Sequence, residues 1–246
     1  MEKWIYSFNK NIDDVKNPAV LLGNKGVGLN LMTGLGLPVP QGFTILTSLN
    51  HYFQKNKSFP IEFENELAEN ISKLEKMSNC KFGSTTNPLL VSVRSGSQKS
   101  MPGMLDTILN IGFNTKVLKF YEEQNKGLFA WDTWRRFLHM FSHVVYKIEH
   151  FYFDEILDSY LLGAGLQFEK DLEVNDIAEI CNQYLILIED RIGRSFPEDV
   201  DEQLVLSIKA VMESWFNERA IDYRRINEIP DNFGTAVNIQ RMVFGN

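Results

Sequence analysis

A chain of 246 residues is long enough for one large domain or two small ones. Hydrophobic residues make up 44% of the sequence and charged residues 23%, which is the balance of an ordinary globular chain with enough apolar material for a core. The formal net charge of −7 argues against a nucleic-acid partner, because contact with phosphate backbones requires a surface of clustered lysine and arginine.

The sequence also argues against a membrane partner. No apolar run approaches the roughly 20 residues of a membrane-spanning helix, and Met1–Trp4 leads into a strand-like segment instead of a signal peptide. We therefore expect a cytoplasmic protein. Cys80 and Cys181 are isolated, without metal-ligand spacing or a catalytic signature, and are expected to be free thiols.

The first predicted elements are a strand over 4–8, a helix, and a strand over 41–45. Asn24 is a suitable N-cap for the helix, and the glycine pair and proline within 34–38 are suited to end it. An amphipathic pattern over 61–77 predicts a scaffold helix. The apolar side of the helix after Asn24 is predicted to contain Val27, Leu31, Met32 and Leu35.

Lys25 lies in the first turn of the predicted helix. Exposed N–H groups and the helix dipole already favour an anion there, so an unpaired lysine at this position suggests that an anion is bound. The alternative is a solvated lysine beside a helix start. The glycines at 23, 26 and 28 do not have the spacing of a dinucleotide fingerprint, and no Walker motif occurs.

A serine- and glycine-rich segment separates two further predicted strands, over 89–93 and 108–111. Such a segment buries little apolar side chain, but it offers backbone N–H groups, hydroxyls and mobility, which suit the oxygens of a polyanion. Arg94, at the end of the first strand, is able to bind a phosphate through two N–H groups. The alternative is an ordinary exposed loop between two hairpin strands.

From 115 to about 216 the pattern is helical only, which indicates an inserted helical subdomain. Arg135 and Arg136 lie in the centre of an aromatic-rich helix and are expected to pair with neighbouring acids such as Asp132 or Glu149 rather than with phosphate. Helical spacing of apolar residues is found over 128–145, 177–188 and 204–215.

His139 and His143 are four residues apart, a spacing that metal sites use on one face of a helix. No third ligand is evident, so neutral histidines without a metal are the favoured interpretation. Near the end of the sequence, Arg219, Arg224 and Arg225 form a basic cluster that either pairs with Glu218, Asp222 and Glu228 or faces a partner domain. The last predicted strand covers 236–244 and stops at Gly245–Asn246.

The string SVRSG…SMPGM-x-DT resembles the glycine-rich loop of the nucleotide-binding domain of pyruvate phosphate dikinase. Ordered blocks along the whole chain make this a stronger indication than one short motif. Related phosphoenolpyruvate synthases typically carry an SSATAEDLP-type loop, so SMPGM favours the phosphate-using dikinase. The other matching blocks are MEKW (1–4), LLGNKGVGLNLMTGLGLPVPQGFTI (21–45), WDTWRRF (131–137), RAIDYRR (219–225) and GTAVNIQRMVFGN (234–246).

The resemblance implies an α+β fold: the first part of an ATP-grasp nucleotide-binding domain with an all-helical inserted subdomain. The ATP-grasp part would cover 1–112 plus 218–246, and the insertion 113–217. The second ATP-grasp half, the phosphohistidine domain and the pyruvate-binding domain have no counterpart in this sequence, so we expect a fragment of the parent enzyme.

The resemblance also implies a set of ATP-binding residues. Lys25 and Arg94 would neutralise charge on the phosphates, and 100–104 would cover them as a lid. Asp106 and Thr107 would anchor the far end of the lid, or else contact the ligand. The backbone near 240–243 would bind the adenine. The full set is Lys25, Arg94, Ser100, Met101, Pro102, Gly103, Met104, Asp106, Thr107, Gln240, Met242 and Val243.

The parent enzyme would convert ATP, phosphate and pyruvate to AMP, diphosphate and phosphoenolpyruvate through a phosphohistidine in a later domain. We therefore assign no catalytic residue and no Mg²⁺ ligand to this chain. Mg²⁺ is an expected cofactor whose ligands would lie in the missing part of the parent enzyme, and we expect the fragment alone to be inactive. The phosphohistidine domain is the expected partner, and the parent is expected to be a homodimer. The alternatives are a related dikinase such as phosphoenolpyruvate synthase, or a scaffold or interaction role without nucleotide binding.

Overall fold

A five-stranded antiparallel sheet forms the centre of the fold. The computed structural model describes residues 3–8, 12 and 15–244, and its sheet has the strand order β1-β2-β7-β5-β6. Helices cover this sheet, which confirms a mixed helix and sheet fold of the α+β kind. The strands are β1 (Ile5–Ser7), β2 (Gly42–Ile45), β5 (Val91–Gly96), β6 (Thr107–Ile111) and β7 (Ala236–Arg241), with a separate parallel pair of β3 (Lys81–Phe82) and β4 (Pro88–Leu89).

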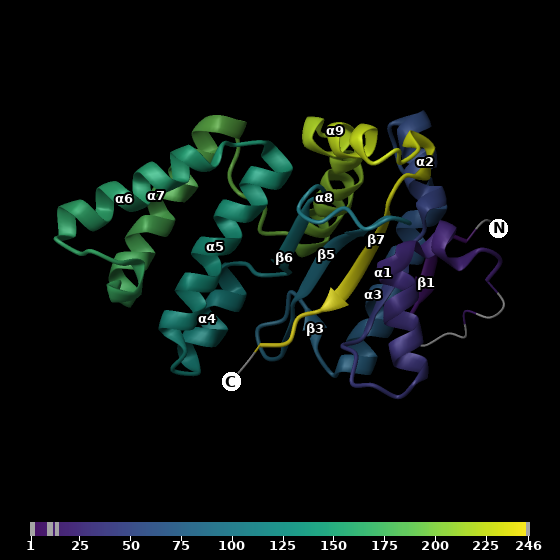
Figure 1. The fold of residues 1–246 in the computed structure, drawn as a ribbon. Coiled ribbons are helices and arrows are strands. Elements are labelled where there is room, and N and C mark those ends of the chain that lie inside the picture. The colour runs from purple at the N-terminus through teal and green to yellow at the C-terminus, as the bar shows by residue number, and fades with distance from the viewer. Residues whose placement is uncertain (1–2, 9–11, 13–14, 245–246) are drawn as a thin grey trace.

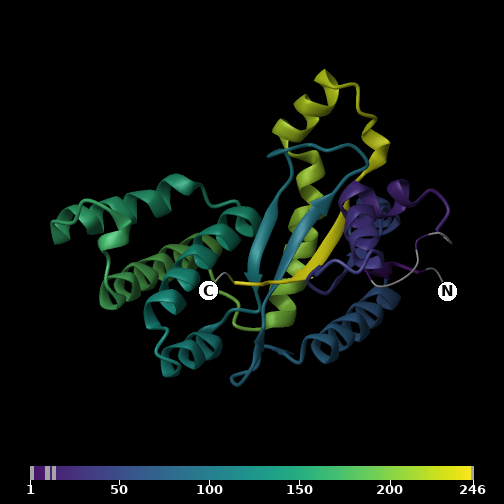
Figure 2. The ribbon, with the colours of Figure 1, turned by 60° about the horizontal axis from the view of Figure 1, so that its bottom comes forward.

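Between β6 and β7 all the regular secondary structure is helical, as predicted from the pattern over 115–216. Figures 1 and 2 show α4–α7 on one side of the sheet, away from α1–α3. None of the described helices combines the length and the apolarity needed to cross a membrane. The α-helices are α1 (Pro18–Gly34), α2 (Thr47–Asn56), α3 (Ile61–Ser78), α4 (Thr115–Glu123), α5 (Gly127–Tyr146), α6 (His150–Ala164), α7 (Val174–Ile192), α8 (Val200–Glu213) and α9 (Glu218–Ile226); the 3-10 helices are η1 (Glu169–Asp171), η2 (Ser214–Phe216) and η3 (Asp231–Phe233).

One face of the sheet forms the main hydrophobic core. Val93, Ile108 and Ile239 come from three adjacent strands and are fully buried in a cluster that also contains Ile208 and Val211 of α8. Helix α8 packs directly against β5, β6 and β7 (Figure 2). This helix therefore covers the sheet, unlike α6 and α7, which lie apart from it. Division of the chain into an ATP-grasp part and an inserted subdomain stays a prediction.

The other face of the sheet carries a polar row. Thr107, Arg94, Asn238 and Thr44 are register partners on four adjacent strands, so their side chains emerge on the same face. Helix α1 lies on part of this face, and the approach is close because its contact residue is Gly26. A Cβ added to Gly26 would lie 2.8 Å from Thr44 Oγ1 and 3.3 Å from Asn238 Oδ1.

The structure corrects two predictions about the first helix. The helix begins at Pro18 rather than after Asn24, but Gly23 has φ 65° and ψ 164°, so the regular turns are interrupted immediately before Asn24. The predicted apolar side was also wrong, because Leu31, Met32 and Leu35 are exposed. The opposite side of the helix, which contains Gly26, faces the sheet. The residues buried by α1 are Leu22, Gly23, Gly26, Leu29 and Asn30.

Other predicted elements are confirmed. The helix over 61–77 is α3, and the patterns over 128–145, 177–188 and 204–215 correspond to α5, α7 and α8. The strand predicted over 236–244 is shorter, because β7 ends at Arg241; Gly245 and Asn246 lie outside the described residues. Cys80 and Cys181 are free thiols, and burial raises the pKa of Cys181.

Candidate functional site

A cavity of about 490 Å³ lies where α1 meets the segment between β5 and β6. We call this segment, residues 97–106, the Ser/Gly loop. The cavity contains two of the predicted groups, Lys25 and the tip of the loop, which are at least 75 residues apart in the sequence, whereas Arg94 is not among its lining residues. Its lining consists of Asn24, Lys25, Ser95, Gly96, Ser97, Ser100, Met101, Pro102, Gly103, Leu105 and Thr107.

Glycine permits the close contact of α1 with β5. A Cβ on Gly23 would lie 1.8 Å from the carbonyl oxygen of Gly96, and the backbone of Gly23 has φ 65°, a conformation that other residues rarely adopt. The backbone N–H of Asn24 then donates to the carbonyl of Ser97 at 3.0 Å. These contacts fix the start of the regular α1 turns beside the base of the Ser/Gly loop and so place Lys25 in the cavity.

Lys25 is a half-buried cation beside a second cation. Its Nζ donates to the carbonyl oxygen of Ser95 at 2.7 Å. Burial, together with the positive charge of Arg94, lowers the pKa of Lys25 to about 8. Among the described residues neither Lys25 nor Arg94 forms an ion pair. Two adjacent cations without a protein counter-ion favour the binding of an anion between them.

The far end of the Ser/Gly loop is fixed by Asp106. Its backbone N–H donates to Ser214 Oγ at 3.2 Å, and its carboxylate accepts from Asn217 Nδ2 at 3.2 Å. The same carboxylate forms an ion pair with Arg219 and lies 3.7 Å from Lys147 Nζ. Asp106 is thus directed away from the cavity and toward η2, α9 and α5.

Three of the predicted residues, Gln240, Met242 and Val243, lie at or just beyond the other end of strand β7. Gly96 is opposite Ala236, whereas Ser92 is opposite Gln240, so Gln240 is about 13 Å along the strand from the base of the Ser/Gly loop. The N–H groups of Arg241 and Met242 already donate to the carbonyls of Gln41 and Leu90. These two N–H groups are therefore already used within the protein, whereas Val243 is exposed.

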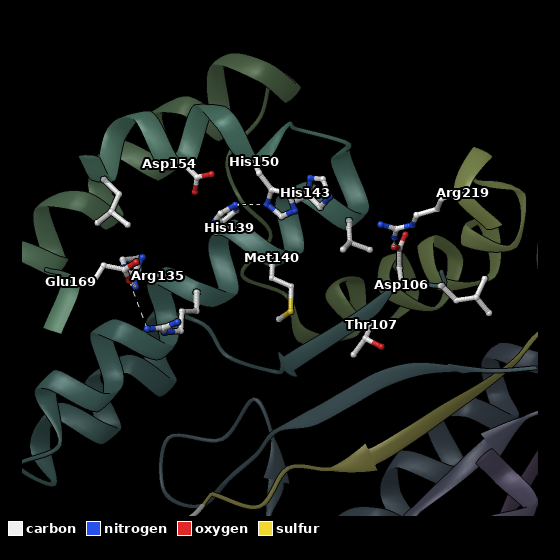
Figure 3. Close-up of a pocket in the computed structure, with 14 residues that line it drawn as sticks. Asp106, Thr107, Arg135, His139, Met140, His143, His150, Asp154, Glu169 and Arg219 are labelled. Carbon is white, nitrogen blue, oxygen red and sulfur yellow. Dashed lines mark hydrogen bonds and ion pairs between the residues drawn. The ribbon is translucent and has the colours of Figure 1, made fainter. Parts of the chain in front are cut away.

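A second cavity, of about 430 Å³, adjoins the first and shares Leu105 and Thr107 with it. Figure 3 shows three histidines in the middle of this cavity, between the Arg135–Glu169 pair on one side and the Asp106–Arg219 pair on the other. His139 Nε2 and His150 Nδ1 are 2.7 Å apart, and the rings of His143 and His150 stack with centroids 3.5 Å apart. His150 was not predicted to join this cluster, because it belongs to α6, whereas the other two histidines belong to α5.

The basic residues near this second cavity are paired with acids. Arg135 donates to Asp132 at 3.0 Å and to Glu169 at 2.7 Å (Figure 3 labels Arg135 and Glu169). Arg136 pairs with Asp132 at 2.8 Å. Asp132 was a predicted partner, whereas the second partner is Glu169 and not Glu149. Among the described residues, no group of three or more His, Cys, Asp or Glu side chains is arranged to hold a metal ion.

The histidine cluster predicts acid sensitivity. Burial and the adjacent His150 lower the pKa of His139 to about 4, below its ordinary value of 6.5, so the unfolded chain takes up a proton first as the pH falls. The contribution of neutral His139 to the free energy of unfolding is fully present above pH 6.5 and is lost as the pH falls toward 4. His139→Gln should reduce this loss, measured as the thermal midpoint at pH 7 and pH 5. His51→Gln, outside the cluster, is the control; an unchanged pH response in His139→Gln would contradict the prediction.

Comparison with known proteins gives the same family along the chain. The family model "Pyruvate phosphate dikinase, AMP/ATP-binding domain" matches residues 55–246. Across its full length the chain is 43% identical to the pyruvate, phosphate dikinase of Clostridium symbiosum over 249 residues, and 47% identical to that of Rickettsia prowazekii over 251 residues. The protein of Giardia intestinalis is 44% identical over 227 residues, which cover 92% of this chain.

The aligned region is a part of each relative. The chain spans 28% of the Clostridium and Rickettsia proteins and 26% of the Giardia protein. The family match includes the Ser/Gly loop and β7, and the full-length alignments add β1, Lys25 and the rest of α1. The chain belongs to the pyruvate phosphate dikinase family and corresponds to its AMP/ATP-binding domain.

Proposed function

We propose that this chain binds ATP, with the phosphates in the cavity between Lys25 and the Ser/Gly loop, as part of a pyruvate phosphate dikinase. The observation that carries the proposal is the position of two adjacent cations, Lys25 and Arg94, without a protein counter-ion among the described residues. The relatives are named pyruvate, phosphate dikinases. The proposed reaction converts ATP, phosphate and pyruvate to AMP, diphosphate and phosphoenolpyruvate.

In this proposal the two cations and the loop have different roles. Lys25 and Arg94 neutralise negative charge on the phosphates. The loop tip, 100–104, covers the phosphates and excludes water, and Gly103 has φ 72° with open space around it, which permits movement at the tip. Asp106 anchors the loop through the contacts described above, and Thr107 completes the cavity wall.

The adenine is proposed to lie toward the end of β7. Val243 offers an exposed backbone there, and Met242 offers an apolar, polarizable side chain. Gln240 is held by its own side-chain bond to the carbonyl of Pro40, at 3.1 Å, and would support the strand from the α1 side of the sheet. An extended nucleotide would then run along the polar face from Val243 to Lys25.

Mg²⁺ is expected with the nucleotide, but the described residues that line the cavity include no carboxylate. Carboxylates are the usual protein ligands of Mg²⁺. We therefore assign no Mg²⁺ ligand to the lining of this cavity, and the protein ligands of the ion would come from the second ATP-grasp half of the parent enzyme. The ATP-grasp assignment, the helical insertion, the phosphohistidine domain as partner, the homodimer and the cytoplasmic location belong to the same proposal and rest on the sequence.

The test is a titration with Mg·ATP at several pH values. Bound phosphate would favour the charged form of Lys25, so binding takes up a proton above pH 8, where the unliganded lysine loses its charge. The affinity should fall roughly tenfold between pH 7 and pH 9, as expected for a pKa of about 8.

The titration of Lys25 affects folding stability in the opposite direction to ATP affinity. Because the pKa of Lys25 is lowered, the unfolded chain binds more protons than the folded one between pH 8 and pH 10.5, and this group favours folding as the pH rises through that window. Weaker ATP binding at pH 9 is therefore not explained by loss of structure at Lys25. Calorimetry at pH 7, 8 and 9 measures the effect, and an affinity that does not vary with pH would contradict a charged Lys25 contact.

A further inference from the structure

The Ser/Gly loop has one buried residue in its central part. Between residues 98 and 105, Met101 alone is buried, with 7% of its surface exposed, whereas Pro102 and Gly103 next to it are exposed. A buried methionine in an otherwise exposed loop suggests that this side chain holds the loop in place.

Met101 packs in a small hydrophobic cluster that is separate from the main core. The cluster contains Trp215 of η2, Ala220 of α9 and Ile229, and partly buried Met104 and Leu105 adjoin it. It thus connects the middle of the loop to the segment between α8 and β7, and not to the sheet or to α1.

Contacts outside the loop hold the rest of this cluster, which we call the platform, in place. Trp215 is fully buried, and its Nε1 donates to the carbonyl of Asp231 at 3.0 Å. The guanidinium of Arg224 lies 4.3 Å from the Trp215 ring and pairs with the Asp231 carboxylate at 2.8 Å. The platform is therefore fixed by contacts in which Met101 takes no part.

We propose that Met101 is a positioning residue: its burial against Trp215 holds the Ser/Gly loop where it forms one wall of the phosphate cavity. The inference rests on the proposed function for its effect on ATP. Met101 attaches the middle of the loop, whereas its far end is held by Asp106 and by the Met104 carbonyl, which accepts from Arg219 Nε at 3.1 Å. The tip between them, Pro102–Gly103, is exposed. When the Met101 side chain leaves the cluster, the loop tip and the cavity wall formed by residues 97–101 are no longer fixed.

The first test needs no nucleotide. The N–H of Met104 donates to the carbonyl of Met101 at 3.1 Å, so hydrogen exchange at Met104 reports whether the loop is held. We expect this amide to be protected in the unmodified 246-residue chain and to exchange roughly tenfold faster in Met101→Ala. Amides of α3 and α5 should not change. Exchange at the rate of a free peptide in the unmodified chain would overturn the proposal.

The second test separates positioning from direct contact. In Met101→Ala the Kd of Mg·ATP should rise about tenfold, since only a fraction of molecules has the loop in place, whereas the Kd of AMP, which lacks the β and γ phosphates, should change less than twofold. Met101→Leu should behave like the unmodified chain. Met77→Ala, at an exposed position on α3, is the control.

The outcomes of these tests separate the role of Met101 in holding the loop from its role in ATP binding. An equal loss of ATP and AMP affinity, or unchanged ATP affinity in Met101→Ala despite faster exchange, would overturn the role of Met101 in ATP binding. A Met101→Leu variant as weak as Met101→Ala would contradict a role for Met101 that rests on apolar packing against Trp215. If the unmodified chain binds no ATP, the proposed function fails, and the exchange measurement still decides whether Met101 holds the loop.

Discussion

Replacing Lys25 with methionine should weaken the binding of Mg·ATP roughly 10- to 100-fold. A hydrogen bond to a charged group contributes about 1.5–3 kcal/mol, and about 1.4 kcal/mol corresponds to a tenfold change in Kd. Methionine retains most of the length of the side chain and removes the charge beside Arg94. Calorimetric titration of Mg·ATP measures the effect.

The same substitution should not destabilise the unliganded protein. Burial and the charge of Arg94 both disfavour the charged form of Lys25, so its removal relieves an unfavourable interaction. A loss of ATP affinity with an unchanged or higher midpoint of denaturation is the expected combination. Lys76→Met, at an exposed position on α3, is the matched control and should alter neither quantity. ATP affinity that survives Lys25→Met would exclude this lysine from the phosphate site.

Gly23→Ala should destabilise the protein by roughly 3–5 kcal/mol, the sum of a backbone conformation that is nearly restricted to glycine and of overpacking. The added Cβ would lie 1.8 Å from the carbonyl oxygen of Gly96, which is backbone and unable to move like a side chain. Either α1 moves away from β5 or β5 is distorted. Chemical denaturation measures the loss, and ATP binding should be lost with it because Lys25 moves with α1.

Gly28→Ala is the matched control for this substitution. Gly28 lies in the same helix, but beyond the adjacent helix backbone and its chain neighbours no atom of the described residues lies within 4 Å of the position of an added Cβ. Alanine is the better helix former, so the control should stabilise the protein by about 0.5–1 kcal/mol. Opposite signs at two glycines five residues apart would show that the backbone conformation and the close approach at Gly23 together require glycine. Equal effects at Gly23 and Gly28 would argue against this explanation.

Local patterns in the sequence predicted most of the elements around the site. The strand ending near Arg94, the Ser/Gly loop and the strand after it follow from short-range alternation and turn residues. Strand β5 nevertheless continues to Gly96, two residues beyond the predicted end at Arg94, because Gly96 pairs with Ala236. Pairing across 140 residues of sequence leaves no local signal, so strand ends of this kind are not predictable from one sequence.

Long-range contacts also explain the failures. The buried side of α1 was mispredicted because contact with the sheet is made through Gly26, where the absence of a side chain is the decisive property. A pattern of large apolar residues does not reveal such a contact. The attachment of Asp106 to Arg219 and the burial of Met101 against Trp215 join segments more than 100 residues apart. The family resemblance identified these loop residues, but the sequence did not predict the residues that they contact.

The most direct test of the account is hydrogen exchange of the 246-residue chain with and without Mg·ATP. If the phosphates lie between Lys25 and the Ser/Gly loop, bound nucleotide should slow exchange in residues 24–28 and 95–104 and leave α6 and α7 unchanged. Protection that is absent from both of these segments, at a nucleotide concentration that saturates binding, would contradict the proposed site.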